Sequence, residues 1–418
     1  MPTYLTPGVY VEEVEGGPRP IESQSTSTPV IIGTGGRASL PEGAEFGVPF
    51  AVNNWTQYAG TFLGEGAMTP LSHAVNGFFM NTQGRCYILD IGRAGSLAGT
   101  VEQPGLSVLE GIEDISIVLA PAFTEPADQE AVMAHCEKMR DRVAILDAPR
   151  EVTDIMSLTR VSTVEAPVTS ESPPETGGDG VDSGAARERP PTRTRRQLEA
   201  HRPRPCDLAT LYHPWILVRD LVTGEVVAAP PSGHMAGLWA RTDATRGVHK
   251  APANEPLRGV VGVQRRISSA EQGELNQVGV NVIRLFDRMG TRPWGARTLS
   301  DDPQWRYLNV RRLFCMVEES IALGTQWIVF EPNDHTLWNL IVRDITDYLT
   351  RLWRDGALMG RTPAEAFFVK CDSETNPADV VDAGRVVALI GLAPVKPAEF
   401  IVFKVSQFSG GATTQEVR

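Results

Sequence analysis

The sequence predicts an α/β (α+β) protein of several domains with extended ends. Three features support this: a length of 418 residues, short apolar runs alternating with helix-like stretches between residues 70 and 150, and long amphipathic patterns near the C-terminus. A chain of this length exceeds the usual size of one hydrophobic core, so two or three domains are expected. Short buried strands that alternate with helices are typical of a sheet covered on both faces.

The first segment has the pattern of a short strand at the end of a tether. Val9-Tyr10-Val11 alternates after the break at Pro7-Gly8, and Gly16-Gly17-Pro18 follows. Such a strand cannot stabilise itself, but it can complete an open sheet edge elsewhere. Residues 1–22 are therefore predicted to form an N-terminal arm. The stretch has neither a basic leader nor an apolar core, so no secretory signal is expected.

The next part of the chain predicts a covered sheet. The apolar run Val30–Ile32 leads into Gly33–Gly36, whose spacing is not GxGxxG and which no P-loop lysine follows, so a strand and loop is favoured over a phosphate cradle. The pattern then predicts helices over Leu71–Met80 and Ala127–Arg140, and strands over Arg85–Asp90, Ile115–Leu119 and Arg142–Asp147.

Residues 161–205 interrupt this pattern. Ser, Thr, Pro, Gly and Glu are frequent up to about residue 182, and arginines then take over at 187, 189, 193, 195, 196, 202 and 204. The segment has almost no core-forming residues, which predicts a flexible surface insertion. Docking of its basic half on a partner is the alternative.

The C-terminal third has the clearest periodicity. Asp302-Pro303 predicts the start of a helix that ends at Gly324, and Asn333 predicts the cap of a second helix that ends near Gly356. Strands are predicted over Thr325–Phe330, Phe367–Lys370, Arg385–Ile390 and Glu399–Val405.

Composition excludes several classes of protein. The formal net charge is −12, which argues against a nucleic-acid partner because phosphates need a basic footprint. No apolar run is long enough to span a bilayer, so no direct membrane insertion is expected. Five cysteines without CxxC spacing predict reduced thiols in a cytoplasmic product, and seven scattered histidines predict neither a metal site nor a cofactor.

One central segment raises the possibility of catalysis. Ser232 and His234 lie two residues apart, and Asp90 ends a predicted strand. A hydrolase triad needs a base and a carboxylate within reach of the serine, yet the chain has no GxSxG elbow. Ser232 is therefore assigned to a Pro-Pro-Ser-Gly turn and His234 to packing beside it, and an enzyme is not expected.

Several stretches taken in order resemble the contractile tail sheath family of phages and related injection systems. They are residues 6–13 (TPGVYVEE), 230–237 (PPSGHMAG), 241–243 (RTD), 246–254 (RGVHKAPAN), 275–281 (LNQVGVN), 294–298 (WGART), 329–333 (VFEPN) and 394–400 (PVKPAEF). The resemblance covers the N-terminal arm and most of residues 211–408, and weakens between about 40 and 205.

The resemblance implies a structural subunit that polymerises into six-fold helical rings around an inner tube and contracts to drive that tube through a target envelope. The implied partners are other copies of the chain, the inner tube protein, and baseplate and terminator or cap proteins. The implied location is the cytoplasm of the producing cell, within a phage tail or tail-like particle. The implied domains are an arm at 1–22, an α/β outer domain at 23–285 with the insertion, an inner C-terminal domain at 286–404 and a C-terminal arm at 405–418.

Two sets of residues are expected to make the contacts. Strands donated between subunits are expected to use Val9, Tyr10, Val11, Phe400, Ile401, Val402, Phe403 and Val405. Contacts to the tube are expected from Arg306, Arg311, Arg312, Arg343, Arg351 and Arg354, with solvated helix faces as the alternative. A subtilisin-like serine hydrolase and a binding module that never polymerises are the competing functions.

Overall fold

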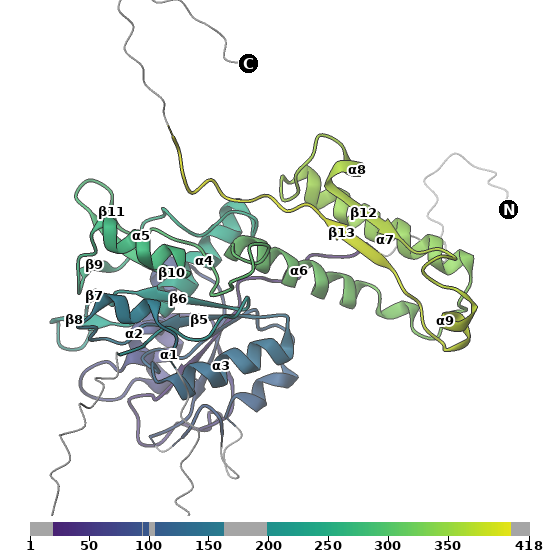
Figure 1. Ribbon diagram of the computed structural model, residues 1–418. Helices are drawn as coiled ribbons and strands as arrows, with labels where there is room; N and C mark the ends of the chain where they lie inside the picture. Colours follow the sequence, from purple (N-terminus) through teal and green to yellow (C-terminus); the bar gives the residue numbers. More distant parts are fainter. Residues whose placement is uncertain (1–19, 94, 100–104, 163–198, 403–418) are drawn as a thin grey trace, which may run out of the picture.

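The structure is a computed structural model that describes residues 20–93, 95–99, 105–162 and 199–402. It has a large α/β body and an elongated C-terminal unit, and helix α6 (Leu308–Gly324) runs from one to the other (Figure 1). The multi-domain α/β class predicted from the sequence is therefore confirmed. The arm residues Val9, Tyr10, Val11, Phe403 and Val405 lie outside the described residues, as do positions 163–198 of the expected insertion.

An eight-stranded sheet forms the centre of the body, in the order β11-β10-β6-β5-β4-β1-β3-β2. The inner strands are parallel, and the edge strands β2 and β11 are antiparallel to their neighbours. The strands are β1 (Pro29–Gly33), β2 (Phe50–Val52), β3 (Cys86–Asp90), β4 (Ile117–Leu119), β5 (Val143–Asp147), β6 (Ala209–His213), β10 (Val280–Phe286) and β11 (Gly290–Pro293).

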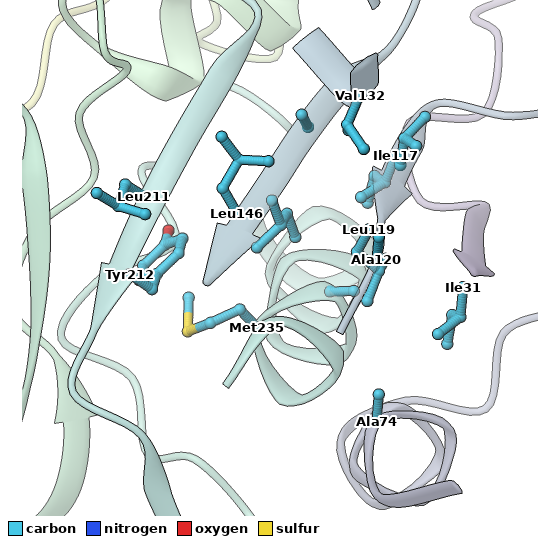
Figure 2. Packing of buried hydrophobic residues seen from close by; sticks show 14 of the residues in the cluster. Ile31, Ala74, Ile117, Leu119, Ala120, Val132, Leu146, Leu211, Tyr212 and Met235 are labelled. Atoms are coloured by element: carbon cyan, nitrogen blue, oxygen red, sulfur yellow. The ribbon is translucent and has the colours of Figure 1, made fainter. Parts of the chain in front are cut away.

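Helices cover this sheet on both faces. All five residues of β5 are buried, and β5 packs against both α3 and α4. Figure 2 shows the resulting core, with Met235 of α4 and Ala74 of α2 beside the strands. The helices of the body are α1 (Trp55–Phe62), α2 (Pro70–Asn81), α3 (Pro126–Met139), α4 (Ser232–Arg246) and α5 (Ser269–Gln277), with 3₁₀ turns η1 (Gly105–Gly111) and η2 (Ile155–Thr159).

The helices and strands expected between residues 70 and 147 are confirmed as α2, β3, β4, α3 and β5. A small sheet on the body pairs β7 (Ile216–Arg219) with β8 (Val226–Ala229) and β9 (Val260–Val263). The domain boundary expected after residue 285 falls inside the β10–β11 hairpin of the large sheet.

The C-terminal unit has its own hydrophobic core. Helix α7 (His335–Arg354) is strongly amphipathic, and its apolar stripe packs under a two-stranded sheet of β12 (Phe367–Lys370) and β13 (Leu389–Leu392). The short elements η3 (Gln326–Ile328), α8 (Pro363–Ala366) and α9 (Ala378–Asp382) complete the unit. Ile21 belongs to this second core although it is far away in the sequence.

Three expected elements around α6 and α7 are placed differently. Helix α6 begins at Leu308 instead of Asp302, because residues before it fold back through a bridge between Arg297 and Tyr307. The strand expected over Thr325–Phe330 is wrong: the chain there makes the turn η3 between α6 and α7. The cap of α7 is Asp334, whose carboxylate accepts from two backbone amides, and Asn333 accepts from Trp338.

The last expected strands also differ. The strand expected over Arg385–Ile390 is observed as β13 at Leu389–Leu392. Residues 399–402 are not in a sheet, and the side chains of Phe400, Ile401 and Val402 are exposed. An apolar run without a partner strand cannot form a ladder alone, which is why the expected strand is absent from this single subunit.

The expected surface insertion is wrong for its last residues. Arg202 is buried and donates to the carbonyl of Leu299, and Arg204 forms ion pairs with Glu130 and Glu137 of α3. Residues 199–205 therefore belong to the folded body. Arg187, Arg189, Arg193, Arg195 and Arg196 lie outside the described residues.

Candidate assembly site

The β12–β13 hairpin has two open edges. Its strands pair only with each other among the described residues, with Phe367 opposite Leu392 and Lys370 opposite Leu389. One face lies on α7, while Phe368 and Leu389 are each 53% exposed. Unpaired backbone groups on both sides of an exposed two-stranded sheet are a template for further strands. The hairpin therefore has the geometry of an acceptor for donated strands.

The described N-terminus is fixed at the far end of α6, inside the C-terminal unit. The side chain of Ile21 is 1% exposed and packs on Gly324, where an added Cβ would lie 2.8 Å from it. Arg351 of α7 donates to the carbonyl of Ile21 at 2.5 Å, and the amide of Gln24 donates to Ser320 at 2.9 Å. We call residues 20–28 the N-terminal root, because the predicted arm precedes them.

The N-terminal root then runs along α6 towards the body (Figure 1). Thr26 donates its hydroxyl to Asp243 of α4 at 2.6 Å and accepts from Arg312 of α6 through its carbonyl at 2.7 Å. Arg312 also forms an ion pair with Asp243 and lies 4.7 Å above the ring of Trp239. One cluster of three residues thus joins the root, the body and the C-terminal unit.

The described C-terminus is also fixed to the body. After β13 the chain returns to the body, where Arg297 forms an ion pair with Glu399. Beyond this pair Phe400, Ile401 and Val402 are 76%, 74% and 78% exposed. We call residues 393–399 the C-terminal root. Three consecutive exposed apolar residues at the end of an anchored segment fit a strand that leaves its own subunit.

The six arginines expected to contact a tube differ in accessibility. Arg311 and Arg312 are 1% and 3% exposed, and Arg311 stacks on Trp305 between Asp207 and Glu318. Both are therefore wrong as tube contacts and act as internal ties. Arg343, Arg351 and Arg354 are exposed on α7, and Arg306 is half-buried before α6.

Ser232 is buried at the first turn of α4 and is not the turn residue expected. Its hydroxyl donates to Asp147, at the end of β5, at 2.7 Å, and its amide donates to the same carboxylate at 2.9 Å. Burial raises the pKa of Asp147 to about 7. The pair fastens the start of α4 to the sheet.

No described histidine acts as a base for Ser232. His234 is buried with both ring nitrogens unpaired, and burial lowers its pKa to about 3. Its ring packs against Gly77 of α2, so the expected packing role is confirmed. Asp90, the carboxylate considered for a triad, bonds to the amide of Gly92. His234 fills space between α2 and α4, and Ser232 bonds to Asp147 and not to a histidine, so these residues do not form the relay that serine catalysis needs.

Sequence reasoning missed Arg297 and Glu399 as a pair. Each lies inside one of the stretches that carry the family resemblance, residues 294–298 and 394–400, so a signal was present without any indication that the two meet. Over the described ranges, no helix is long and apolar enough to cross a membrane, and no group of three or more His, Cys, Asp or Glu side chains is arranged to hold a metal ion.

Comparisons with known proteins agree with this architecture. Residues 106–299 match the phage tail sheath protein central domain, and residues 300–408 match the phage tail sheath C-terminal domain. A putative prophage major tail sheath protein of Pseudomonas aeruginosa (strain UCBPP-PA14) is 31% identical over 46% of this chain and 49% of its own length. The tail sheath protein of Salmonella phage ViI is 28% identical over 71% of this chain and 44% of its own length. The matched regions thus span about half the length of these curated relatives.

Two solved assemblies resemble the whole chain. The PVC sheath complex of an extracellular contractile injection system, in the contracted state, has a TM-score of 0.73 at 27% identity and covers 97% of this chain and 99% of its own. The helical sheath of the anti-feeding prophage in the contracted state has a TM-score of 0.72 at 28% identity, covering 97% and 100%. The two sheath domain matches together run from residue 106 to residue 408, and the chain belongs to the contractile tail sheath family.

Proposed function

We propose that this chain is a sheath subunit that polymerises into helically stacked six-fold rings around an inner tube and contracts to drive the tube through a target envelope. The observation that carries the proposal is the open β12–β13 hairpin in a chain whose N-terminal and C-terminal roots are both anchored on the subunit. The similarity to contracted sheaths of injection systems supports it.

Strand exchange supplies the connection between subunits. A donated arm that pairs along one four-residue edge of the hairpin makes about four hydrogen bonds, worth ~1 kcal/mol each before side-chain burial. The arms are the segments around Val9-Tyr10-Val11 and around Phe400–Val405. Because each arm continues into a root fixed on its own subunit, the links persist while the bodies rotate against one another.

The contraction requires two packings of the same subunits that differ in free energy, with the extended packing held kinetically. A few kcal/mol per subunit suffice, since the gains add over the cylinder. Tube contacts are assigned to the exposed arginines of α7, Arg343, Arg351 and Arg354, with Arg306 beside α6. Exposed cations make weak contacts that can detach during the stroke. Baseplate and terminator proteins complete the particle at its ends.

The test is assembly of the purified protein. The full chain is expected to form hollow cylinders in negative-stain images, and deletion of residues 1–14 is expected to yield a folded monomer that does not assemble. A matched control deletes a similar length inside 163–198, which lies apart from the roots and the hairpin in the sequence. Intact cylinders from the 1–14 deletion would overturn arm exchange, and a full chain that stays monomeric at high concentration would favour a binding module.

A further inference from the structure

The C-terminal root is held to the body at two points before the exposed apolar residues begin. The first is Val395, whose carbonyl accepts from the side chain of Asn309 at 3.1 Å. The second is Glu399, which pairs with Arg297. The next three residues, Phe400, Ile401 and Val402, are all exposed. Glu399 is therefore the last fixed point of the described chain.

The Arg297–Glu399 pair has the geometry of a firm attachment. Arg297 Nε donates to Glu399 Oε1 at 2.9 Å, and Nη2 donates to Oε2. The two side chains are 9% and 17% exposed, so the pair is shielded from solvent far more than an ordinary surface ion pair. A two-pronged guanidinium–carboxylate contact fixes direction as well as distance.

The body also holds Arg297 through hydrogen bonds to Asn281 and Asn276. The side-chain amide of Asn281, fully buried on β10, donates to the carbonyl of Arg297 and accepts from its amide, both at 2.8 Å. Arg297 Nη1 donates to the carbonyl of Asn276 in the last turn of α5 at 2.7 Å. Gly295 allows this approach, because an added Cβ would lie 2.9 Å from Asn281 Oδ1. The guanidinium is thus oriented before Glu399 reaches it.

A second buried amide holds the root at Val395. Asn309, 1% exposed at the start of α6, donates to the carbonyls of both His249 and Val395. Four of the stretches singled out in the sequence, residues 246–254, 275–281, 294–298 and 394–400, therefore meet at the C-terminal root although they lie far apart in the chain. Strand exchange alone does not require these stretches to meet there.

We propose that Arg297 and Glu399 form a latch that fixes the point and direction from which the C-terminal arm leaves its subunit, and so set how readily a neighbour captures it. This inference rests on the proposed exchange of arms. Both residues are positioning residues: they hold the root and leave the paired strand itself to Phe400 and the residues after it.

Tether length gives the size of the effect. Without the latch the last fixed point retreats from Glu399 to Val395, which adds four residues, or roughly 13 Å of extended chain. Counted to the middle of the arm, near residue 402, the tether grows from about three to about seven residues, and the effective concentration of the arm falls roughly fourfold, following the −3/2 power of length. A nucleus that must close several arms at once suffers a larger loss, on the order of tenfold.

The experiment compares Glu399→Gln, Arg297→Gln and the double variant with the full-length wild type. Glu110→Gln is the matched control, because it removes a carboxylate from an exposed ion pair with Lys138 on the body. Three quantities are measured: the lowest protein concentration that yields cylinders, the hydrogen exchange of residues 395–402 in the monomer, and the thermal unfolding of the monomer. Glu399→Gln carries the test, since Glu399 lies outside both cores and its loss leaves the fold intact even if Arg297→Gln does not fold.

The latch predicts that Glu399→Gln raises the assembly threshold four- to tenfold and speeds exchange at 395–402, while the monomer still unfolds in one cooperative thermal transition. It also predicts that the double variant is no worse than Arg297→Gln alone, and that Glu110→Gln matches the wild type. Unchanged exchange or an unchanged threshold in Glu399→Gln would overturn the latch. A truncation after Glu399 separates the two proposals: if it still forms cylinders, C-terminal arm exchange itself is wrong, and if it does not while Glu399→Gln assembles normally, only the latch is wrong.

Discussion

Replacing Arg312 by alanine tests whether the junction of the body, α6 and the N-terminal root is held by one buried cation. Its guanidinium donates to Asp243 Oδ1 at 3.0 Å and to the carbonyl of Thr26 at 2.7 Å, and covers the ring of Trp239. The side chains of Arg312 and Asp243 are 3% and 6% exposed. The variant leaves the Asp243 carboxylate buried with the hydroxyl of Thr26 as its remaining partner.

Breaking a buried ion pair by removing one partner costs about 3–5 kcal/mol, because the other charge stays desolvated. Arg354→Ala on the exposed end of α7 is the matched control and is expected to change the free energy of unfolding by less than about 0.5 kcal/mol. The assay is urea unfolding of the monomer followed by tryptophan fluorescence, to which Trp239 contributes as one of eight tryptophans. If Arg312→Ala is as stable as Arg354→Ala, Arg312 has no structural role, and the original prediction that it faces solvent would be supported instead.

Three further predictions concern the body. Burial lowers the pKa of His213 and His234 to about 3, so below pH 6.5 the unfolded chain binds protons that the folded chain does not, and each histidine lowers the free energy of unfolding by about 1.4 kcal/mol per pH unit. Asp147 and Glu319, with pKa values raised to about 7, act in the opposite direction. The check is therefore the difference between two proteins: from pH 6 to pH 5 the wild type should lose on the order of 1 kcal/mol more in urea unfolding than His234→Gln, and equal losses would contradict it. Ser232→Ala removes the 2.7 Å hydrogen bond to Asp147 and should lower the free energy of unfolding in urea by about 1–3 kcal/mol. A fluorophosphonate probe should label neither the wild type nor this variant. Stoichiometric labelling of the wild type alone would instead indicate a hydrolase. Gly233→Ala places a Cβ 2.3 Å from the backbone of Ala74 and should separate α2 from α4 with a loss of several kcal/mol, whereas Gly60→Ala meets nothing within 4 Å and should leave the thermal midpoint unchanged or higher.

Hydrophobic periodicity predicted the long elements well, for a physical reason. The apolar stripe of α7 recurs at helical spacing, and the short, fully buried run of β5 is too brief for a helix and lies between helical patterns. The run over Thr325–Phe330 failed because it is equally apolar but lies where the chain reverses between two helices. Phe330 in this turn is fully exposed and has a φ of 73°. The local sequence pattern does not predict this conformation.

For the assembly site, too, the sequence predicted some features correctly and missed others. The sequence predicted arms at both ends, and the described structure supplies the roots from which they leave. The sequence analysis wrongly assigned Arg311 and Arg312 to the surface, because charged side chains usually lie in solvent. Arg312, however, follows Leu308 by four residues and precedes Met316 by four, which places it on the buried stripe of α6. The Arg297–Glu399 contact joins residues 102 positions apart, and only the tertiary fold reveals such pairs.

A reconstruction of the assembled cylinder by electron cryomicroscopy would test strand exchange most directly. The account predicts that β12 and β13 are flanked by strands from two neighbouring subunits, one from around residues 9–11 and one from around residues 400–405. A hairpin whose edges remain open in the cylinder, or are filled by the termini of its own subunit, would contradict it.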